Sequence, residues 1–255
     1  LLNASVTLHD TTLEQVALAT LEKLQSYLRS KGRLYHSFRS GQVRSHATAD
    51  DYALLISANL AAYEVTLDWN WVAQADTLMN EAVEYYLDRD DNAFTMAPND
   101  ATDLIVLDKY ANDDVTPNAN ATMVINLWKL STYLNKPDYL ETAEAVFTWL
   151  KPHMTSNPFA CPTAWLAFTA LSEQTQLILV GDATDENFAS LHLACLEISA
   201  PNRLIMHVDK TTELSADHPA SGKTGLDHAA VFVCRNQTCK LPIASAEELL
   251  KSGIH

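Results

Sequence analysis

The chain has 255 residues, of which 47% are hydrophobic, which suits one large globular domain or two small ones. Its 32 acidic residues outnumber the 17 basic ones and give a net charge of −15, so binding to nucleic acid or to an anionic membrane surface is not expected. No apolar run approaches the roughly 20 residues that a helix needs to cross a bilayer.

Apolar patterns with a period of about 3.6 residues predict that the first two thirds of the chain are helical. The first predicted helix covers residues 12–30, and the second begins near Asp50, with a turn or short hairpin at residues 31–42 between them. A third helix begins near Trp69. The long irregular stretch 87–114 follows, and loops of this length are usually functional or form a lid.

The fourth predicted helix covers residues 116–134, with Thr116 as its N-cap and Pro117 in its first turn. A fifth helix follows residues 135–138, and a sixth covers residues 161–172. Short connections between consecutive helices are typical of stacked helical hairpins. The pattern therefore predicts a mainly α architecture for this part of the chain.

The apolar period changes towards the C-terminus. Strand-like runs occupy three segments, residues 176–180, 203–208 and 230–234. Residues 186–198 have a helical pattern, and Ser245 with Glu248 forms a capping box for a last short helix. We therefore divide the chain into a helical part, residues 1–173, and a small α/β tail, residues 174–255.

Five stretches occur in the same order in a known family: DDYALLISANLAAYEVTLD, LDKYANDDVTPNANATMVINLWKLS, LILVGD, APNRLIM and VFVCRNQTCKLPIASAEELL. Together they resemble the C-terminal half of the thioredoxin-domain-containing family related to spermatogenesis-associated protein 20. The resemblance implies an upstream thioredoxin-like domain and an (α/α)6 toroid of helical hairpins, like that of N-acylglucosamine and cellobiose 2-epimerases. This chain would hold the later hairpins, an incomplete toroid, and the α/β tail. Its DDVTPNAN differs from the family pattern because Asp114 and Ala119 replace glycines.

Asp50, Asp51 and Tyr52 open the second predicted helix. Two carboxylates and a phenol could act as acid, base and hydrogen-bonding group on a sugar held in the funnel of a toroid. The structural alternative is that carboxylates at a helix start complement the helix dipole, with Thr48 and Asp51 as a partial capping box. We favour the structural alternative here, and the resemblance keeps the catalytic one open.

Asp113, Asn118 and Asn120 lie around the start of the fourth predicted helix. Their side chains offer fixed donors and acceptors for sugar hydroxyls, so Asp113 is a candidate catalytic residue and the two asparagines are candidate substrate ligands. The same residue types also cap helices and make turns without any ligand. Capping is the expectation for Thr116, whereas both readings stay open for Asn118 and Asn120.

Glu64 and Trp69 are two further candidates for substrate binding. We expect Glu64 to lie at a solvated helix end, although a place in the site stays open. Trp69 could stack on a sugar ring, but aromatic residues at helical spacing are more often part of a core. His36, His46 and His153 lie near predicted helix ends or loops and match no epimerase motif, so we expect surface or supporting roles for them.

Cys234 and Cys239 are separated by four residues in a strand-like run, which is not the Cys-x-x-Cys spacing of thioredoxin-type redox chemistry. A zinc site would need two more ligands, and a disulfide is not expected in a reducing cell. We predict buried thiols, with metal binding as the second choice. Four cysteines in a chain of this length indicate a reducing compartment, so we predict a cytoplasmic protein. We also predict that the protein uses no cofactor.

Two functions follow from these observations. The first is a carbohydrate-active or carbohydrate-binding domain, epimerase- or isomerase-like by resemblance, that acts on a small sugar. The alternative is a non-catalytic scaffold that serves the upstream thioredoxin-like domain. A sugar site requires the candidate polar residues to converge on one cavity, whereas a scaffold would leave them dispersed and used in caps.

Overall fold

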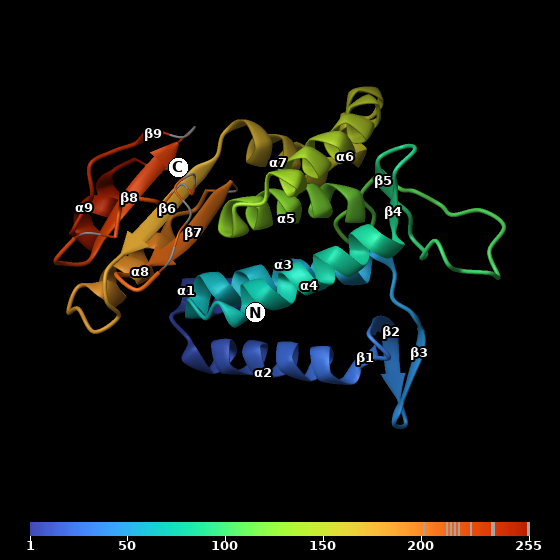
Figure 1. The fold of residues 1–255 in the computed structure, drawn as a ribbon, viewed down its shortest axis with the longest axis horizontal. Helices are drawn as coiled ribbons and strands as arrows, with labels where there is room; N and C mark the ends of the chain where they lie inside the picture. The colour runs from blue at the N-terminus through green and yellow to red at the C-terminus, as the bar shows by residue number, and fades with distance from the viewer. Residues whose placement is uncertain are drawn as a thin grey trace.

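The structure, a computed structural model, describes residues 1–200, 202–212, 214, 216, 218, 220–224, 226–235 and 238–253. Its N-terminal part is helical (Figure 1), as predicted. The helices are α1 (Leu2–Leu8), α2 (Thr11–Tyr27), α3 (Ala49–Thr66), α4 (Asn70–Tyr85), α5 (Ala119–Leu134), α6 (Pro137–Ser156) and α7 (Pro162–Ser172). Of these, α1 was not predicted.

Helical hairpins make up the centre of the molecule. α3 packs against α4, and α5 packs against α6, in each case after a connection of a few residues. Leu67 and Asn135 adopt left-handed backbone conformations at the ends of α3 and α5, which turns the chain back on itself. α3 and α5 also lie side by side, and α7 packs on α5 (Figure 1).

Two irregular regions interrupt the helices. The first contains β1 (Arg29–Ser30), β2 (Arg33–Arg39) and β3 (Gln42–His46), which form an antiparallel sheet and confirm the predicted hairpin. The second runs from α4 to α5. It contains only the short pair β4 (Leu87–Asp88) and β5 (Ala93–Phe94), so the prediction of a long irregular stretch is confirmed. A single turn of 3₁₀-helix, Pro158–Ala160, precedes α7.

The tail forms a four-stranded sheet in the order β7-β6-β8-β9. Its strands are β6 (Thr175–Val180), β7 (Arg203–Val208), β8 (Ala230–Arg235) and β9 (Thr238–Cys239). β6 and β7 are parallel and are connected through α8 (Phe188–Glu197), whereas β8 runs antiparallel to both β6 and β9. The last helix is α9 (Ala246–Lys251), in which the Ser245 hydroxyl accepts a hydrogen bond from the Glu248 N–H at 3.4 Å.

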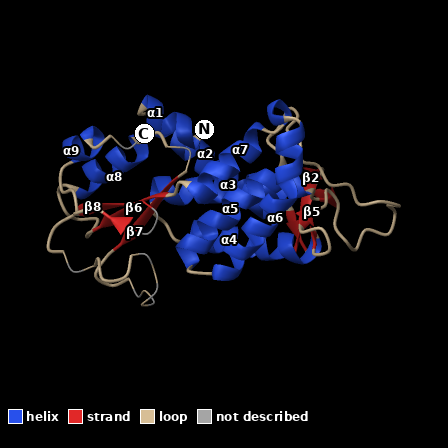
Figure 2. Ribbon diagram, turned by 90° about the horizontal axis from the view of Figure 1, so that it is seen from above, coloured by secondary structure: helices blue, strands red, loops and turns tan. Residues whose placement is uncertain are grey.

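The sheet lies between two layers of helices. Ile178, Val180 and Met206 belong to the core that the α3–α7 helices form. Leu177 and Leu179, whose side chains alternate with these along β6, pack instead with α8 and α9. Figure 2 shows α8 and α9 beside the sheet. β6 begins at Thr175, just after the predicted boundary at residue 173, and the division into two domains remains a prediction.

The cysteines correct one prediction. Cys234 and Cys239 face each other across the β8–β9 pair and form a disulfide, so the prediction of two buried thiols was wrong. The disulfide was not expected because a reducing compartment was predicted, but the β8–β9 register places Cys234 directly opposite Cys239. Cys161 and Cys195 are buried free thiols. Across the described part of the chain, no helix combines the length and the apolar character needed to span a membrane.

Candidate functional site

A cavity of about 570 Å³ opens where the first turn of α3, the segment before α5 and the end of α6 meet. This volume is within the range of small-molecule sites, roughly 300–1,000 Å³. Three of the predicted site residues line it, namely Asp50, Asp113 and Asn118. We call it the Asp50 cavity.

Asp50 is one of the two carboxylates among these three residues, and it is half-buried. It lies in the first turn of α3, where burial is the largest influence on its carboxyl group and raises the pKa. The neighbouring charge of Asp51 raises the pKa further, and a hydrogen bond from the backbone N–H of Ala119 acts in the opposite direction. A carboxyl group that keeps its proton to higher pH is suited to general acid–base chemistry.

Asp113 and Asn118 line the same cavity, but their side chains form hydrogen bonds with the backbone. One carboxylate oxygen of Asp113 accepts from the Asn118 N–H at 2.6 Å, and the other accepts from the Thr163 N–H at 2.8 Å. The Asn118 amide donates to the carbonyls of Tyr110 and Asn112, at 2.7 and 3.2 Å. These contacts fix the cavity wall, because they tie the segment before α5 to α5 and α7.

Asn118 is also the N-cap of α5, which corrects the predicted role of Thr116. The Asn118 side chain accepts a hydrogen bond from the Ala121 N–H at 3.1 Å, and the helix begins at Ala119. Thr116 is exposed two residues earlier, outside the helix. The sequence Thr116-Pro117 has the pattern of a helix start, but asparagine is at least as favourable an N-cap residue as threonine, and Asn118 is the N-cap here.

Asn120 does not reach the Asp50 cavity. Its side chain is 1% exposed. It accepts from the Phe94 N–H at 2.6 Å and donates to the carbonyls of Phe94 and Tyr110, at 3.0 and 3.1 Å. Asn120 therefore anchors both ends of the irregular segment to α5 and is closed off from a ligand.

Asp51 and Tyr52 also face away from the Asp50 cavity. Asp51 accepts from the Thr48 N–H at 2.7 Å, which completes the predicted capping box, and pairs with His36 at 2.8 Å. The buried Tyr52 hydroxyl donates to Glu81 at 3.1 Å and accepts from the Leu34 N–H at 3.3 Å. Burial raises the pKa of Tyr52 well above its ordinary value. The contacts of Asp51 and Tyr52 therefore stabilise the fold and do not face the Asp50 cavity.

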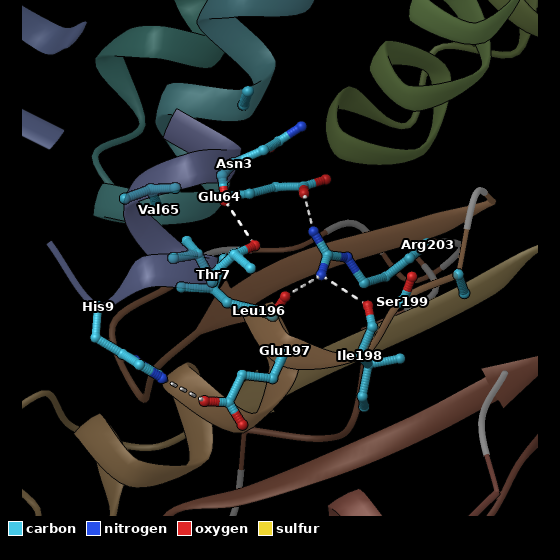
Figure 3. A pocket seen from close by; sticks show the side chains of 13 residues that line it. Asn3, Thr7, His9, Glu64, Val65, Leu196, Glu197, Ile198, Ser199 and Arg203 are labelled. Carbon is cyan, nitrogen blue, oxygen red and sulfur yellow. Dashed lines mark hydrogen bonds and ion pairs between the residues drawn. The ribbon is translucent and has the colours of Figure 1, made fainter. Parts of the chain in front are cut away.

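Glu64 is buried near the opposite end of α3, so the expectation of a solvated helix end was wrong. Its carboxylate pairs with Lys129 at 2.8 Å and with Arg203 at 3.1 Å, and it accepts from the Tyr133 hydroxyl at 3.2 Å. Burial alone would raise its pKa, but the two cations bring the pKa below the ordinary value. Figure 3 shows Glu64 and Arg203 in a second cavity, of about 510 Å³.

Arg203 completes this arrangement from the tail. Its guanidinium donates to the carbonyls of Cys195, Leu196 and Ile198, at 3.1, 2.7 and 2.9 Å. Figure 3 shows the bonds to Leu196 and Ile198. These carbonyls lie at the C-terminal end of α8, which favours a cation. Glu64 and Arg203 therefore join α3 to α8 and β7, which is a structural role.

Trp69 lies at the turn between α3 and α4 and is 44% exposed. It lines a third cavity, together with Tyr63 and Tyr133 from α3 and α5. This cavity and the Asp50 cavity lie at opposite ends of α3. Of the eight predicted site residues, the structure thus brings together three, at the Asp50 cavity.

The residues that line the Asp50 cavity without having been predicted as site residues include Lys109, Tyr110, Asn112 and His153. Lys109 pairs with Asp88 at 2.6 Å and with Asp91. The His153 ring lies 4.9 Å from the Trp149 ring. No local pattern marks these residues, because loop packing and the end of α6 bring them to the cavity.

The Asp50 cavity offers side chains that can form hydrogen bonds and transfer protons. Asp50 supplies a carboxyl group, His153 an imidazole and Tyr110 an exposed ring. No group of three or more His, Cys, Asp or Glu side chains within the described residues could hold a metal ion. The arrangement can bind hydroxyl groups and exchange protons with a ligand.

Comparison with known proteins gives distant relatives. Spermatogenesis-associated protein 20 from Mus musculus is 26% identical over 209 residues, which are 79% of this chain and 26% of that protein. The Homo sapiens protein of the same name is 24% identical over the same share. The uncharacterized protein B0495.5 of Caenorhabditis elegans is 24% identical over 226 residues, 88% of this chain and 30% of its own length.

These matches support a relationship between this chain and spermatogenesis-associated protein 20. The chain spans between about a quarter and a third of the length of the curated relatives it matches. No family model matches the chain.

Proposed function

We propose that the Asp50 cavity binds a small sugar and that Asp50 exchanges protons with it, as in a sugar epimerase or isomerase. The observation that carries this proposal is a half-buried carboxyl group with a raised pKa in a cavity of about 570 Å³. Perturbed carboxyl groups in cavities of ligand size are typical of functional sites. The surrounding amides and carbonyls offer the donors and acceptors that sugar hydroxyls need.

In this proposal, Asp50 and His153 are the proton-transfer groups. They come from different helices, α3 and α6, and line the same cavity. Moving a proton to or from a carbon next to a carbonyl group needs a base and an acid with pKa values near neutrality. A proton that one group removes from a carbon and the other group returns to its opposite face inverts that stereocentre. A proton that is returned to the neighbouring carbon, together with a proton shift between the two oxygens, moves the carbonyl group. In both cases the composition of the sugar is unchanged.

The charge of the cavity favours a sugar without a phosphate group. Among the described residues, Asp50, Asp113 and Asp114 line it, and Lys109, which also lines it, is already paired with Asp88 and Asp91. A phosphate would meet this excess of negative charge, and Lys109 is not free to offset it. We therefore propose an uncharged sugar as the ligand.

For the whole protein, we propose an (α/α)6 toroid that is completed outside this chain, and an upstream thioredoxin-like domain as its partner. The face of α7 supports the first part. Ala164 and Ala167 of α7 are buried, whereas Trp165 and Phe168 are each 44% exposed. An apolar helix face of this kind is usually covered by further protein. The proposed location is the cytoplasm, without a nucleic-acid or membrane partner.

Thermal unfolding with a panel of monosaccharides and disaccharides tests the sugar site. A ligand at about ten times its dissociation constant adds about 1.4 kcal/mol to the free energy of unfolding, which is a measurable rise in Tm. We expect this rise for the wild-type protein and its loss in Asp50→Asn. Asp51→Asn is the matched control, because Asp51 is the neighbouring carboxylate but faces away from the cavity. It should lower the starting Tm and keep the rise.

The competing function is a scaffold, and one observation favours it: Asp51, Tyr52 and Asn120 are fully used in holding the structure. Under this alternative, none of the sugars raises Tm. If a sugar raises the Tm of Asp50→Asn as much as it raises the Tm of the wild-type protein, the sugar binds at another site.

A further inference from the structure

The loop between β5 and α5 carries an exposed apolar run. Leu104, Ile105 and Val106 are 49%, 102% and 68% exposed. Among the described residues, none forms a hydrogen bond with the backbone of residues 103–107. Apolar side chains in solvent beside free backbone groups are a template for pairing with another strand. We call residues 99–108 the arm.

The charged side chains of the arm are all acidic. They are Asp100, Asp103 and Asp108, and the arm has no Lys or Arg. Asp100 pairs with Arg33 of β2 at 2.8 Å within the same molecule. Asp103 is exposed, and no described residue forms an ion pair with it. The arm therefore has an exposed acidic group next to its apolar run.

The hairpin of β2 and β3 has the opposite charge. Residues 29–46 hold five of the 17 basic residues of the chain and no Asp or Glu. Arg39 and Arg44 are exposed, and no described residue forms an ion pair with either of them. β3 is an edge strand, because the sheet has the order β1-β2-β3. The hairpin therefore offers exposed cations along an edge strand.

The hairpin divides its apolar and basic groups between two faces. Phe38 lies opposite Val43 in the β2–β3 pair, so these two apolar side chains share one face. Arg39 and Arg44 follow them in the sequence and lie on the other face, because successive side chains of a strand point to opposite faces. Phe38 is 42% exposed, so the apolar face is open to a partner.

An extended arm has the same division. Leu104 and Val106 share one face of such a strand, because the side-chain period of a strand is two residues. Asp103 then lies on the other face. Paired along β3, the arm places its two apolar side chains on the Phe38 face of the hairpin and its acidic group on the arginine face.

The arm and the hairpin lie at the same end of the molecule. Figure 1 shows the arm within the green loop that follows β5, at the same end as β2 and β3, and Figure 2 shows the same placement. In a two-fold symmetric dimer, the arm of each copy can therefore reach the hairpin of the other, and the contact closes without forming a filament. The net charge of −15 on each copy opposes this contact little, because charges more than about 8 Å apart are largely screened at physiological ionic strength.

We propose that the arm is a dimerisation segment that pairs with β3 of a second copy of this chain. Leu104 and Val106 cover the apolar face of the hairpin, and Asp103 lies beside the two arginines. All residues of the arm are described, and none of them lines the Asp50 cavity, so the proposal does not depend on the sugar site.

Sedimentation velocity tests the dimer at protein concentrations up to about 100 μM, which populate dimers with a Kd of that order. We expect the wild-type protein to pass from monomer to dimer. Val106→Asp should weaken the dimer roughly a hundredfold, because each of the two contacts loses a buried valine. Val115→Asp is the matched control and should leave the dimer unchanged, since Val115 is 94% exposed but lies outside the arm and the hairpin. A protein that stays monomeric would leave both surfaces to a different partner and overturns the proposal, as does a dimer that Val106→Asp does not weaken.

A charge exchange between two variants shows whether the arm contacts another copy. Arg39→Glu/Arg44→Glu reverses the charge of the hairpin, and Asp103→Lys reverses the exposed charge of the arm. Each variant alone should dimerise roughly tenfold more weakly than the wild-type protein, because like charges meet in both contacts. An equimolar mixture should recover the dimer, because the two altered surfaces attract each other and the two unaltered surfaces do as well. A mixture that dimerises no better than either variant alone overturns the proposal.

Discussion

At the scale of single residues, Glu64 is a buried carboxylate outside the proposed site that is held by two ion pairs. Its carboxylate meets two cations that come from different elements, Lys129 of α5 and Arg203 of β7. All three side chains are less than 20% exposed, at 6%, 17% and 17%. Such a cluster is stable only while its charges match, because each unpaired charge would stay in a poorly solvated place.

Glu64→Gln should therefore lower the free energy of unfolding by about 3–5 kcal/mol at neutral pH, since Lys129 and Arg203 would lose their counter-charge. The pKa of Glu64 is lower in the folded protein, so its contribution is present above the ordinary pKa and is lost as the pH falls through the folded-state pKa. Urea unfolding at several pH values measures this loss. Glu144→Gln, on the exposed side of α6, is the control and should change stability by less than about 0.5 kcal/mol.

Asp50 should show the opposite dependence on pH. Its pKa is raised in the folded protein, so ionisation above that pKa costs stability, whereas below its ordinary pKa of 3.8 there is no cost. Asp50→Asn should therefore raise Tm at pH 7, by on the order of 1–2 °C because water screens the half-exposed group, and should leave it unchanged in acid. Asp138→Asn is the control, since it also removes an acid from a first helical turn but from an exposed one. It should not raise Tm.

The residue scale also shows what the sequence could not predict. Thr48 and Asp51 form the capping box that their spacing of three residues predicts, because this interaction lies within one turn. Glu64 was placed in solvent because its partners are 65 and 139 residues away. No local pattern contains that information.

At the scale of elements, the start of α5 decides the shape of the Asp50 cavity. Asn118 both caps α5 and bonds to two carbonyls of the preceding segment. Asn118→Ala should therefore lower the free energy of unfolding by about 2 kcal/mol, the upper range for a lost cap. Thr116→Ala should change it by less than about 0.5 kcal/mol, because Thr116 is exposed outside the helix. Chemical denaturation of both variants measures the difference, and equal losses would restore Thr116 as the cap.

The β8–β9 pair gives a prediction about the cysteines. The chain has four, of which Cys234 and Cys239 are joined and Cys161 and Cys195 are free. Thiol titration of protein that has been unfolded without a reductant should therefore find two thiols. Four thiols would instead mean that Cys234 and Cys239 are not joined, as the sequence analysis predicted.

Most elements could be predicted from their apolar period, including α3, α4, α6 and the tail strands β6, β7 and β8. This works because each of them buries one face or both. α1 has seven residues and no side-chain cap, so it gives neither a period nor a start signal. The fold of the segment between α4 and α5 could not be predicted either, since Asn120 of α5 holds it through the Phe94 backbone, 26 residues away.

At the scale of the whole molecule, the helical part and the tail share a core. Ile178, Val180 and Met206 of the sheet are at most 2% exposed and pack with the helices. The Glu64–Arg203 pair crosses the same contact. Removing the tail would expose this apolar face and leave Glu64 with one cation fewer. We therefore expect residues 1–173 and 174–255 to unfold together.

Two local probes test this expectation. All five tryptophans lie within residues 1–173, so tryptophan fluorescence reports on the helical part alone. In a Cys161→Ala variant, the buried Cys195 of α8 is the remaining free thiol, and its reaction with a thiol reagent reports on the tail. Because a shared core couples the two parts, both probes should give the same urea midpoint. Cys195 that reacts at a lower urea concentration than the fluorescence midpoint would mean that the tail opens first, and the division at residue 173 would then separate two independent units.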